Sequence, residues 1–361
     1  VTGEHGTTRP YDALLLATGS DPFVIPVPGA GLDGVVTFRD LAYVEKMLAA
    51  AGRGGPAVVI GGGPAGATAA HELAKAGRSV ALIERGQIGG TCINVACIPT
   101  KTMVASAKLI EMASRASDFG VSLAAPPPDL TGVIARKRRV VGAMVDTHWT
   151  LFTTTPNLSF LLGEGVFTGE RTITVDLQDG STRVVRGERV YINTGSHTTV
   201  PPIPGLDTVD YLTSTSVMEL DELPKRLAII GGGYIALEFA QVFRRLGSEV
   251  VVVQRGERFL PNEDTDIAAE IRKVLVEDGI EFLDNTDTDS VSPGVEGVEL
   301  RRITDCGASL VEFGARLIEL GLPIVGDRAG VTGRLRGVAQ RITRKHLAFG
   351  ANEANQLCLH E

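Results

Sequence analysis

An internal repeat is the feature of this sequence that most constrains the fold. Residues 57–86, AVVIGGGPAGATAAHELAKAGRSVALIERG, align without a gap on residues 227–256, LAIIGGGYIALEFAQVFRRLGSEVVVVQRG, at a constant offset of 170 residues. Each copy contains a short apolar run, a glycine cluster, an amphipathic stretch that ends in glycine, and a second run rich in apolar residues. This order predicts a strand, a helix and a second strand. A repeat of this regularity is hard to obtain by chance, so two similar β-α-β units are expected.

The glycine cluster of each copy fits the G-x-G-x-x-G/A pattern of dinucleotide-binding loops. The first glycine permits a tight turn, the second lets backbone N–H groups approach a pyrophosphate, and the third position allows close packing of helix on strand. A polar residue follows 23 positions after the first glycine, Glu84 in one copy and Gln254 in the other. Glycines that only shape turns are the alternative interpretation. The motif residues are Gly61, Gly63 and Gly66 in the first copy and Gly231, Gly233 and Ala236 in the second.

A second element also occurs twice, as an apolar run followed by T-G-S and a proline-rich segment that ends in Pro-Gly. Residues 11–29 read YDALLLATGSDPFVIPVPG, and residues 189–205 read RVYINTGSHTTVPPIPG. In the second occurrence the turn falls at Thr194 and Gly195. The series of T-G-S, Pro-Gly and glycine motif therefore begins twice along the chain.

Composition and charge exclude several classes of protein. Hydrophobic residues make up 43% of the 361 residues and charged residues 22%, which is typical of a globular chain and not of a disordered one. The net charge of −8 gives no overall field that would attract nucleic acid or an anionic membrane. The basic run RKRR at residues 136–139 is expected to be a solvated helix face. No apolar stretch reaches the ~20 residues of a membrane helix and no signal peptide is evident, so a cytoplasmic location is expected.

Cys92 and Cys97 lie in GQIGGTCINVACIPTK, directly after Glu84 and Arg85, and Lys101 follows four residues beyond the second cysteine. A zinc site is one interpretation, but no second cysteine pair or histidine cluster supplies further ligands, and no resident metal is expected. Two buried thiols that only fill the core are a second interpretation. The pattern favours a third, a redox-active disulfide in which one thiolate attacks a substrate while its partner exchanges charge with an electron carrier.

The segment GGTCINVACIPTK resembles the G-G-T-C-x-N-x-x-C-x-P-[ST]-K signature of the FAD-dependent pyridine nucleotide-disulfide oxidoreductases, the family of dihydrolipoamide dehydrogenase, glutathione reductase and mercuric reductase. Only Ala96 departs from the signature, where the family usually has glycine. The resemblance covers residues 57 to about 288. It implies an α/β fold of two Rossmann-like domains, one for FAD and one for NAD(P), with a three-layer β/β/α organisation.

The resemblance also implies roles for individual residues. Cys92 would be the thiol that meets the substrate, and Cys97 the charge-transfer thiol next to the flavin. Lys101 would lie near flavin N5 and pair with Glu238, because a carboxylate partner keeps an ammonium charged in a low-dielectric site. Tyr234 would gate the nicotinamide pocket, although Tyr234 and Glu238 also suit plain helix packing positions. The implied FAD contacts are Gly61, Gly63, Gly66, Glu84, Gly90, Thr91, Lys101, Thr194 and Gly195, and the implied NAD(P) contacts are Gly231, Gly233, Tyr234, Ala236 and Glu238.

The second copy lacks the carboxylate that would hold a ribose 2′-hydroxyl and repel a 2′-phosphate. Gln254 stands at that position, and Arg255 and Arg258 follow it. Arginines hold a phosphate by bidentate hydrogen bonds, so NADPH is expected in preference to NADH. Two solvated surface arginines are the alternative interpretation.

Four segments are expected along the chain. Residues 1–56 resemble the end of an FAD domain and the start of an NAD domain from a nitrite-reductase-like flavoprotein, which suggests a chimera. Residues 57–215 would form the FAD-binding domain with the redox cysteines, and residues 216–289 an incomplete NAD(P)-binding domain. Residues 290–361 show no alternating strand pattern and are expected to be a divergent helical tail or a shifted reading frame. The interface domain of the family, with its His-x-x-x-x-Glu pair, is expected to be missing.

The expected function is a flavoprotein oxidoreductase that passes hydride from NAD(P)H through FAD to a Cys92–Cys97 disulfide, which then reduces a small-molecule disulfide or a metal ion. A truncated or chimeric flavin-binding protein without turnover is one alternative. An electron carrier that binds both nucleotides but does not use the disulfide is another. The family suggests a homodimer, and neither nucleic acid nor a membrane is expected as a partner.

Overall fold

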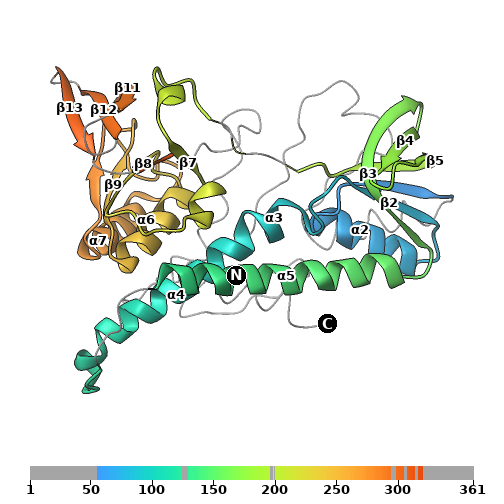
Figure 1. The fold of residues 1–361 in the computed structure, drawn as a ribbon, viewed down its shortest axis with the longest axis horizontal. Helices are drawn as coiled ribbons and strands as arrows, with labels where there is room; N and C mark the ends of the chain where they lie inside the picture. The colour runs from blue at the N-terminus through green and yellow to red at the C-terminus, as the bar shows by residue number, and fades with distance from the viewer. Residues whose placement is uncertain are drawn as a thin grey trace, which may run out of the picture.

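The computed structural model of the chain has β-sheets above a layer of helices (Figure 1), and its described residues form three sheets. The structure describes residues 55–319, apart from residues 124–128, 196–197, 199, 294–297, 305–306 and 314–315. The first T-G-S element and all but two residues of the segment predicted over residues 1–56 lie outside the described residues. Within the described part, no helix is long and apolar enough to span a bilayer.

The first unit contains a six-stranded sheet with helices on one face. Its elements are β1 (Ala57–Ile60), α2 (Pro64–Lys75), β2 (Val80–Glu84), α3 (Gly90–Asn94), α4 (Cys97–Ser114), the 3₁₀ helix η1 (Ala116–Phe119), α5 (Leu130–Thr154), β3 (Leu158–Gly169), β4 (Thr172–Leu177), β5 (Thr182–Arg186) and β6 (Arg189–Ile192). The strand order is β5-β4-β3-β2-β1-β6. Strands β1, β2, β3 and β6 run parallel, and β4 and β5 continue from β3 as an antiparallel meander. Parallel neighbours need crossover connections, which the helices provide.

Alternate residues of β1 and β2 face opposite layers of the first unit. Val59 and Leu82 lie in one apolar core with α2 and with Phe152 of α5, whereas Val58 and Ile83 lie in another core with β4. This alternation is expected of strands that are buried on both faces. The unit therefore has a helical layer, a parallel sheet and an antiparallel layer, which confirms the predicted three-layer organisation.

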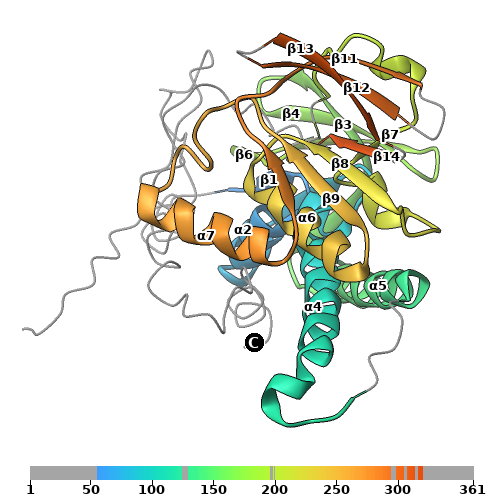
Figure 2. The ribbon, with the colours of Figure 1, turned by 90° about the vertical axis from the view of Figure 1, so that its left-hand side faces the viewer.

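The second unit is built on a five-stranded parallel sheet. Its elements are η2 (Leu206–Thr208), β7 (Tyr211–Thr213), η3 (Ser216–Glu219), β8 (Arg226–Ile230), α6 (Tyr234–Leu246), β9 (Glu249–Val253), α7 (Thr265–Glu277), β10 (Glu281–Leu283), β11 (Asp287–Pro293), β12 (Val298–Thr304), β13 (Gly307–Phe313) and β14 (Arg316–Glu319). The strand order is β10-β9-β8-β14-β7, and all four pairings are parallel. A separate antiparallel sheet, β11-β12-β13, lies above it in Figure 2.

The two sheets confirm the repeat that the sequence predicts. Strand β1, helix α2 and strand β2 correspond to β8, α6 and β9, which lie at the offset of 170 residues. The likeness extends beyond the aligned segments, because β3 and β10 add a third parallel strand and β6 and β14 return beside the first. An antiparallel excursion precedes the returning strand in both units. The chain therefore contains the same supersecondary plan twice.

The structure corrects the expectation of a divergent helical tail for the described residues between 290 and 319. They form the antiparallel strands up to β13 and then β14, which lies between β8 and β7. In β12, Val298 and Leu300 alternate with charged residues over too few positions to stand out. Strand β14 has only four residues and a neighbour on each side, so non-local pairing determines it more than local pattern. Residues 320–361, which include the Gly-Asp pair at 326–327, lie outside the described residues.

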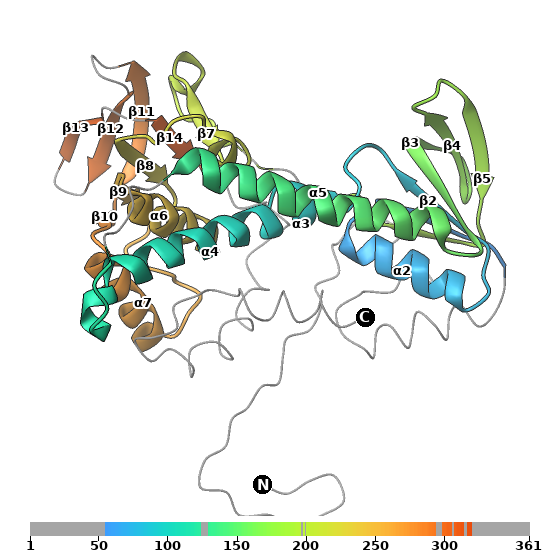
Figure 3. The same cartoon turned by 60° about the horizontal axis from the view of Figure 1, so that its bottom comes forward.

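Helices α4 and α5 of the first unit pack against the second unit. Met103 of α4 and Ile134 of α5 lie in the same apolar core as Leu237 and Phe243 of α6, whereas Phe152 near the end of α5 lies in the helical layer of the first unit. Figure 3 shows α5 running past both sheets. This single helix of 25 residues therefore connects the two apolar cores. Strand β7 also belongs to the second sheet, so the change of unit comes a few residues before the predicted boundary at 215.

Candidate redox and nucleotide-binding site

The first glycine loop turns the chain between β1 and α2. Gly61 has a φ of +104°, which favours glycine, and a side chain there would meet the carbonyl oxygen of Asn193. A Cβ on Gly66 would run into the carbonyl oxygen of Gly61, so a glycine is needed for α2 to pack on the turn. Both glycines thus do what the motif predicts, one at the turn and one at the helix contact.

Gly63 differs from these two because a Cβ there would not collide with the backbone. A Cβ on Gly63 would make only ordinary contacts, 3.7 Å from Asn193 Nδ2 and 3.7 Å from Gly90 Cα. Gly63 is the N-cap of α2, and no side chain caps this helix or adds a negative charge to its first turn. The N–H groups of a helix N-terminus bind anions, so this loop can accept a pyrophosphate at the position that the motif predicts.

Glu84 is the last residue of β2, and its side chain contacts the first glycine loop. Its Oε2 accepts a hydrogen bond of 2.7 Å from Gly62 N, and its Oε1 accepts bonds of 2.9 Å from Gly86 N and 3.1 Å from Gln87 N. Three backbone donors fix the carboxylate beside the glycine loop. The predicted ribose-binding residue therefore lies where dinucleotide-binding folds place it.

The second glycine loop copies the backbone of the first. Gly231 has a φ of +102°, and Gly233 caps α6 without help from a side chain. Ala236 replaces the third glycine and is only 1% exposed, so helix and turn are close but leave room for a methyl group. This loop can also accept a pyrophosphate.

The residues after the second loop differ from those after the first. Gln254 is buried and its Nε2 donates to Gly256 O at 3.1 Å, so an amide replaces the carboxylate at the end of the second strand. Arg255 and Arg258 are both exposed. Arg258 Nη2 lies 3.5 Å from Thr265 Oγ1 at the start of α7. The two predicted phosphate-binding guanidinium groups are thus accessible from solvent.

The predicted redox cysteines lie on two neighbouring helices and are not joined by a disulfide. Cys92 lies in α3 and is partly buried, whereas Cys97 begins α4 and is exposed. The pKa of Cys97 is lowered from 9.0 to about 6. The largest cause is a hydrogen bond from Cys92, and the positive charge of Lys101 also lowers the pKa. Burial and the negative charge of Glu238 act in the opposite direction. Cys97 is therefore largely a thiolate at neutral pH, which is the nucleophilic form. Among the described residues, no group of His, Cys, Asp or Glu could hold a metal ion.

Two neighbours of the cysteines explain the shape of the redox turn. Ala96, the departure from the signature, is the N-cap of α4 and has a φ of −136°, outside the left-handed region that favours glycine. Asn94 donates from Nδ2 to Ile88 O at 2.9 Å and to Gly90 O at 2.8 Å, which ties the end of α3 to the turn before it. Asn94 was not among the predicted site residues, and its place in the signature is the one signal that pointed to it.

Lys101 and Glu238 make the contact that the resemblance implies. Lys101 Nζ lies 2.6 Å from Glu238 Oε1, and the two side chains are 26% and 8% exposed. Lys101 is one helical turn after Cys97 on α4, while Glu238 lies on α6 of the second unit. Because a buried carboxylate is costly unless it is paired, this ion pair joins the two units close to the cysteines.

The remaining predicted residues of the first unit also meet at this place. A Cβ on Gly195, whose φ is +75°, would lie 3.5 Å from Thr91 Oγ1, and Thr194 is exposed beside it. A Cβ on Gly90 would lie 2.6 Å from Gly63 Cα, so the redox turn touches the first glycine loop. The T-G turn, the redox turn and the glycine loop therefore form one continuous site.

Tyr234 opens α6 and is 48% exposed. It precedes Glu238 by four residues, a spacing that places both side chains on one face of the helix. The exposure of Tyr234 does not suit a packing position, while Glu238 is buried in its ion pair. The two residues predicted from α6 thus lie side by side.

Comparisons with known proteins were made on both sequence and structure. Residues 55–324 match the family described as pyridine nucleotide-disulphide oxidoreductase. The chain is 38% identical over 220 residues to mercuric reductase from Bacillus cereus, which covers 61% of this chain and 34% of that protein. It is 40% identical over 222 residues to the probable pyridine nucleotide-disulfide oxidoreductase RclA from Escherichia coli strain K12, which covers 61% of this chain and 46% of that protein.

A solved structure, the HOCl-induced flavoprotein disulfide reductase RclA from Escherichia coli, is similar with a TM-score of 0.62 and 35% identity, over 73% of this chain and 55% of that one. The chain spans between about a third and a half of the length of the curated relatives compared here. The family match extends over most of the chain and includes both glycine loops, the redox turn and the Lys101–Glu238 pair. The chain belongs to the pyridine nucleotide-disulphide oxidoreductase family.

Proposed function

We propose that this chain uses NAD(P)H and FAD to reduce a small-molecule disulfide or a metal ion through the Cys92–Cys97 pair. The observation that carries the proposal is the exposed Cys97 thiol with a pKa of about 6, beside Cys92 and the Lys101–Glu238 ion pair. A thiolate at neutral pH with a second thiol within hydrogen-bond reach is the arrangement that thiol–disulfide exchange requires.

The first unit supports FAD as the bound cofactor. No side chain caps the helix N-terminus at Gly63, and Glu84 stands at the strand end where a ribose would be held. The redox turn adjoins this loop through Gly90. When bound, FAD supplies a two-electron carrier between NAD(P)H and a disulfide.

The two cysteines balance the electrons of the proposed exchange. Cys92 gives up its proton as its sulfur attacks one sulfur of a substrate disulfide, and the other substrate sulfur takes up this proton and leaves as a thiol. Cys97 then attacks the Cys92 sulfur of the mixed disulfide, so that the Cys92–Cys97 bond forms and the second substrate thiol leaves. The substrate has gained two electrons and the cysteine pair has lost two, which is the number that one NAD(P)H carries.

Lys101 and Glu238 are proposed to keep a positive charge beside Cys97. An ammonium favours the thiolate form of a nearby cysteine, and it also stabilises the negative charge of a reduced flavin. Glu238 Oε1 lies 2.6 Å from Lys101 Nζ, and this pairing compensates the cost of placing the two charges in a partly buried site.

We propose NADPH as the preferred nicotinamide cofactor of the second unit, with NADH as the weaker one. Gln254 presents no charge that would repel a 2′-phosphate, and the exposed Arg255 and Arg258 follow within four residues. A homodimer, as the family suggests, and a cytoplasmic location complete the proposal. A flavin-binding protein without turnover and an electron carrier that does not use the disulfide are the two alternatives.

A spectrum separates these possibilities. The purified chain is loaded with FAD, reduced anaerobically with one equivalent of dithionite and scanned at long wavelength. A thiolate–flavin charge-transfer band is expected; flavin without the band would favour the electron carrier, and failure to bind flavin would contradict the proposal. Cys97→Ser should bind flavin and lose the band, whereas the matched variant Cys92→Ser should keep it. A band that survives Cys97→Ser would overturn the assignment of the two thiols.

A further inference from the structure

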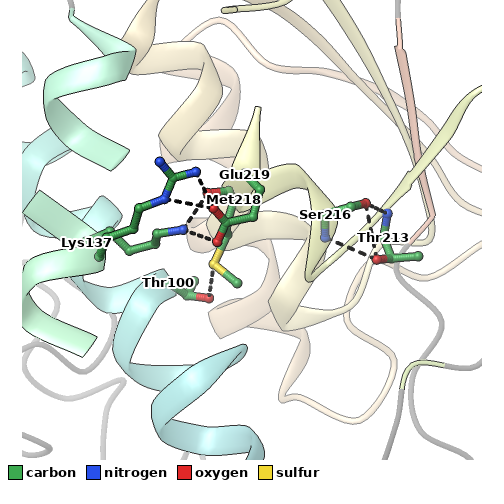
Figure 4. Close-up of polar contacts among 7 residues, drawn as sticks. Thr100, Lys137, Thr213, Ser216, Met218 and Glu219 are labelled. Atoms are coloured by element: carbon green, nitrogen blue, oxygen red, sulfur yellow. Dashed lines mark hydrogen bonds and ion pairs between the residues drawn. The ribbon is translucent and has the colours of Figure 1, made fainter. Parts of the chain in front are cut away.

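Lys137 lies in the basic run at residues 136–139, which the sequence predicts to be a solvated helix face. The structure corrects this for Lys137, because the residue is only 2% exposed. Its Nζ donates to Met218 O at 2.7 Å and to Glu219 Oε1. Met218 and Glu219 belong to η3, the short helix between β7 and β8 of the second unit, whereas Lys137 projects from α5 (Figure 4). An ammonium buried to this degree would be costly without partners, so these contacts fix its position.

Two further side chains reach the same short helix. Thr100 Oγ1 of α4 donates to Met218 Sδ at 3.5 Å, and Arg138 Nη2 of α5 donates to Glu219 Oε2 at 2.8 Å. Burial disfavours the charged form of Glu219, but hydrogen bonds from Lys137 and Arg138 outweigh burial and hold its pKa below the ordinary value. We call these five residues, Thr100, Lys137, Arg138, Met218 and Glu219, the interunit clamp.

The interunit clamp lies next to the redox site on α4. Thr100 contacts η3, and the following residue Lys101 contacts Glu238 on α6, so neighbouring residues of one helix touch two elements of the second unit. Strand β8 and helix α6 follow η3 in the same unit, so the interunit clamp and the Lys101–Glu238 pair both join this unit to α4 and α5.

We propose that Lys137 is a positioning residue that holds the second nucleotide-binding unit against α4 and α5, so that Glu238 stays opposite Lys101 beside the redox cysteines. Its importance to the reaction rests on the proposed function, but its test needs neither cofactor nor substrate. Among the clamp residues, Lys137 is the buried cation that bonds both the backbone and the side chain of η3. Arg138 contacts the same carboxylate from an exposed position, and exposed ion pairs contribute little.

The readout is the pH at which Cys97 becomes half-alkylated by iodoacetamide in the full chain, followed by peptide mass spectrometry. The groups that face Cys97 are Cys92 on α3, Lys101 on α4 and Glu238 on α6, and the negative charge of Glu238 raises the pKa of Cys97. Removal of this charge by Glu238→Gln should therefore lower the midpoint, by about 0.5 pH unit or more. The shift in Glu238→Gln thus shows how far the alkylation midpoint of Cys97 moves when the Glu238 carboxylate no longer acts on it.

Lys137→Met is expected to lower the midpoint in the same direction as Glu238→Gln, and Lys137→Arg, which keeps the charge and the donors, should restore the wild-type value. The matched control Arg138→Met should leave the midpoint unchanged. If Lys137 acts through Glu238, the double variant should show no further shift beyond Glu238→Gln alone. A wild-type midpoint in Lys137→Met, or fully additive shifts in the double variant, would overturn the proposal.

Lys137→Met leaves the carbonyl of Met218 without its donor, so folding of the variant is checked by far-UV circular dichroism. If it does not fold, Lys137→Gln, which keeps a hydrogen-bond donor, takes its place under the same criteria. The absence of a charge-transfer band would count against the proposed function and leave this test intact. An unchanged alkylation midpoint would count against the clamp alone.

Discussion

The two nucleotide-binding units share a backbone plan but differ in the side chains that surround the same loop. In the first unit Gly66 leaves no room for a Cβ, whereas the second unit accommodates the methyl group of Ala236. At the strand end, the carboxylate of Glu84 accepts three backbone hydrogen bonds, whereas Gln254 donates one. The loop backbone is therefore common to both units, and the differences between their ligands are expected to come from a few adjoining side chains.

The largest effect is expected at the third position of the loop. Gly66→Ala should lower the free energy of unfolding by about 3 kcal/mol or more, because the new Cβ would collide with the carbonyl oxygen of Gly61 and force the turn and α2 apart. The matched variant Ala236→Gly should cost only about 1 kcal/mol, from helix propensity and a lost methyl contact. Urea unfolding measures both, and equal losses would show that the two loops are packed alike.

The second position should separate binding from folding. Gly63→Val is expected to leave the chain folded, since a Cβ there has no protein atom within 3.7 Å, but to abolish FAD binding by filling the space in front of the helix N-terminus. Gly233→Val should spare FAD and weaken nicotinamide nucleotide binding. Flavin absorbance after gel filtration and nucleotide titration measure the two effects. Loss of FAD in both variants would show that the units do not bind independently.

The residues that form these loops were largely predictable, because local sequence determines them. The positive φ of Gly61 and Gly231, and the strand-helix-strand order around them, follow from glycine spacing and apolar runs. The Lys101–Glu238 contact joins residues 137 positions apart, and only the family resemblance made it predictable. Helical spacing alone does not show which residue on another element a side chain will meet.

Other features could not be found from local patterns. Strand β14 is four residues long and depends on neighbours that are far away in the sequence. Lys137 follows the buried Val133 by four residues and Ile134 by three, so helical spacing places it on the buried face, but the surrounding charges masked this signal. A charged residue at a buried helical position is thus worth examining for a partner even within a basic run.

The residues that follow strand β9 should determine whether the second unit prefers NADPH or NADH. Replacement of both Arg255 and Arg258 by alanine should weaken NADPH binding by ~100-fold or less, depending on how much of each charge-assisted contact is solvent-exposed, and leave NADH binding nearly unchanged. Gln254→Glu should shift the preference in the same direction by repelling the 2′-phosphate. Titration with NADPH and with NADH measures the two affinities. Equal losses of affinity for both nucleotides would show that the arginines do not bind the 2′-phosphate.

The last comparison concerns the two redox thiols of the first unit. Cys92→Ala removes the hydrogen bond that is the largest cause of the lowered pKa of Cys97, so the midpoint of Cys97 alkylation should rise from about 6 toward the ~8.5 of a free cysteine. The lowered pKa in the folded state stabilises the fold above the unfolded-state pKa, and this contribution is lost as the pH falls through about 6. Cys92→Ser, which keeps a donor, is the control. A midpoint near 6 in Cys92→Ala would assign the shift to Lys101 instead.

Helix α5 has a consequence for how the molecule unfolds. Its first half is buried with Met103 and Leu237 in one core, and Phe152 near its end is buried in the other, so neither core can be exposed to water without breaking contacts on the same helix. The chain should therefore melt in a single calorimetric transition, although it contains two nucleotide-binding units. A fragment that stops after the first sheet would leave the apolar sides of α4 and α5 without their partner and would be prone to aggregate.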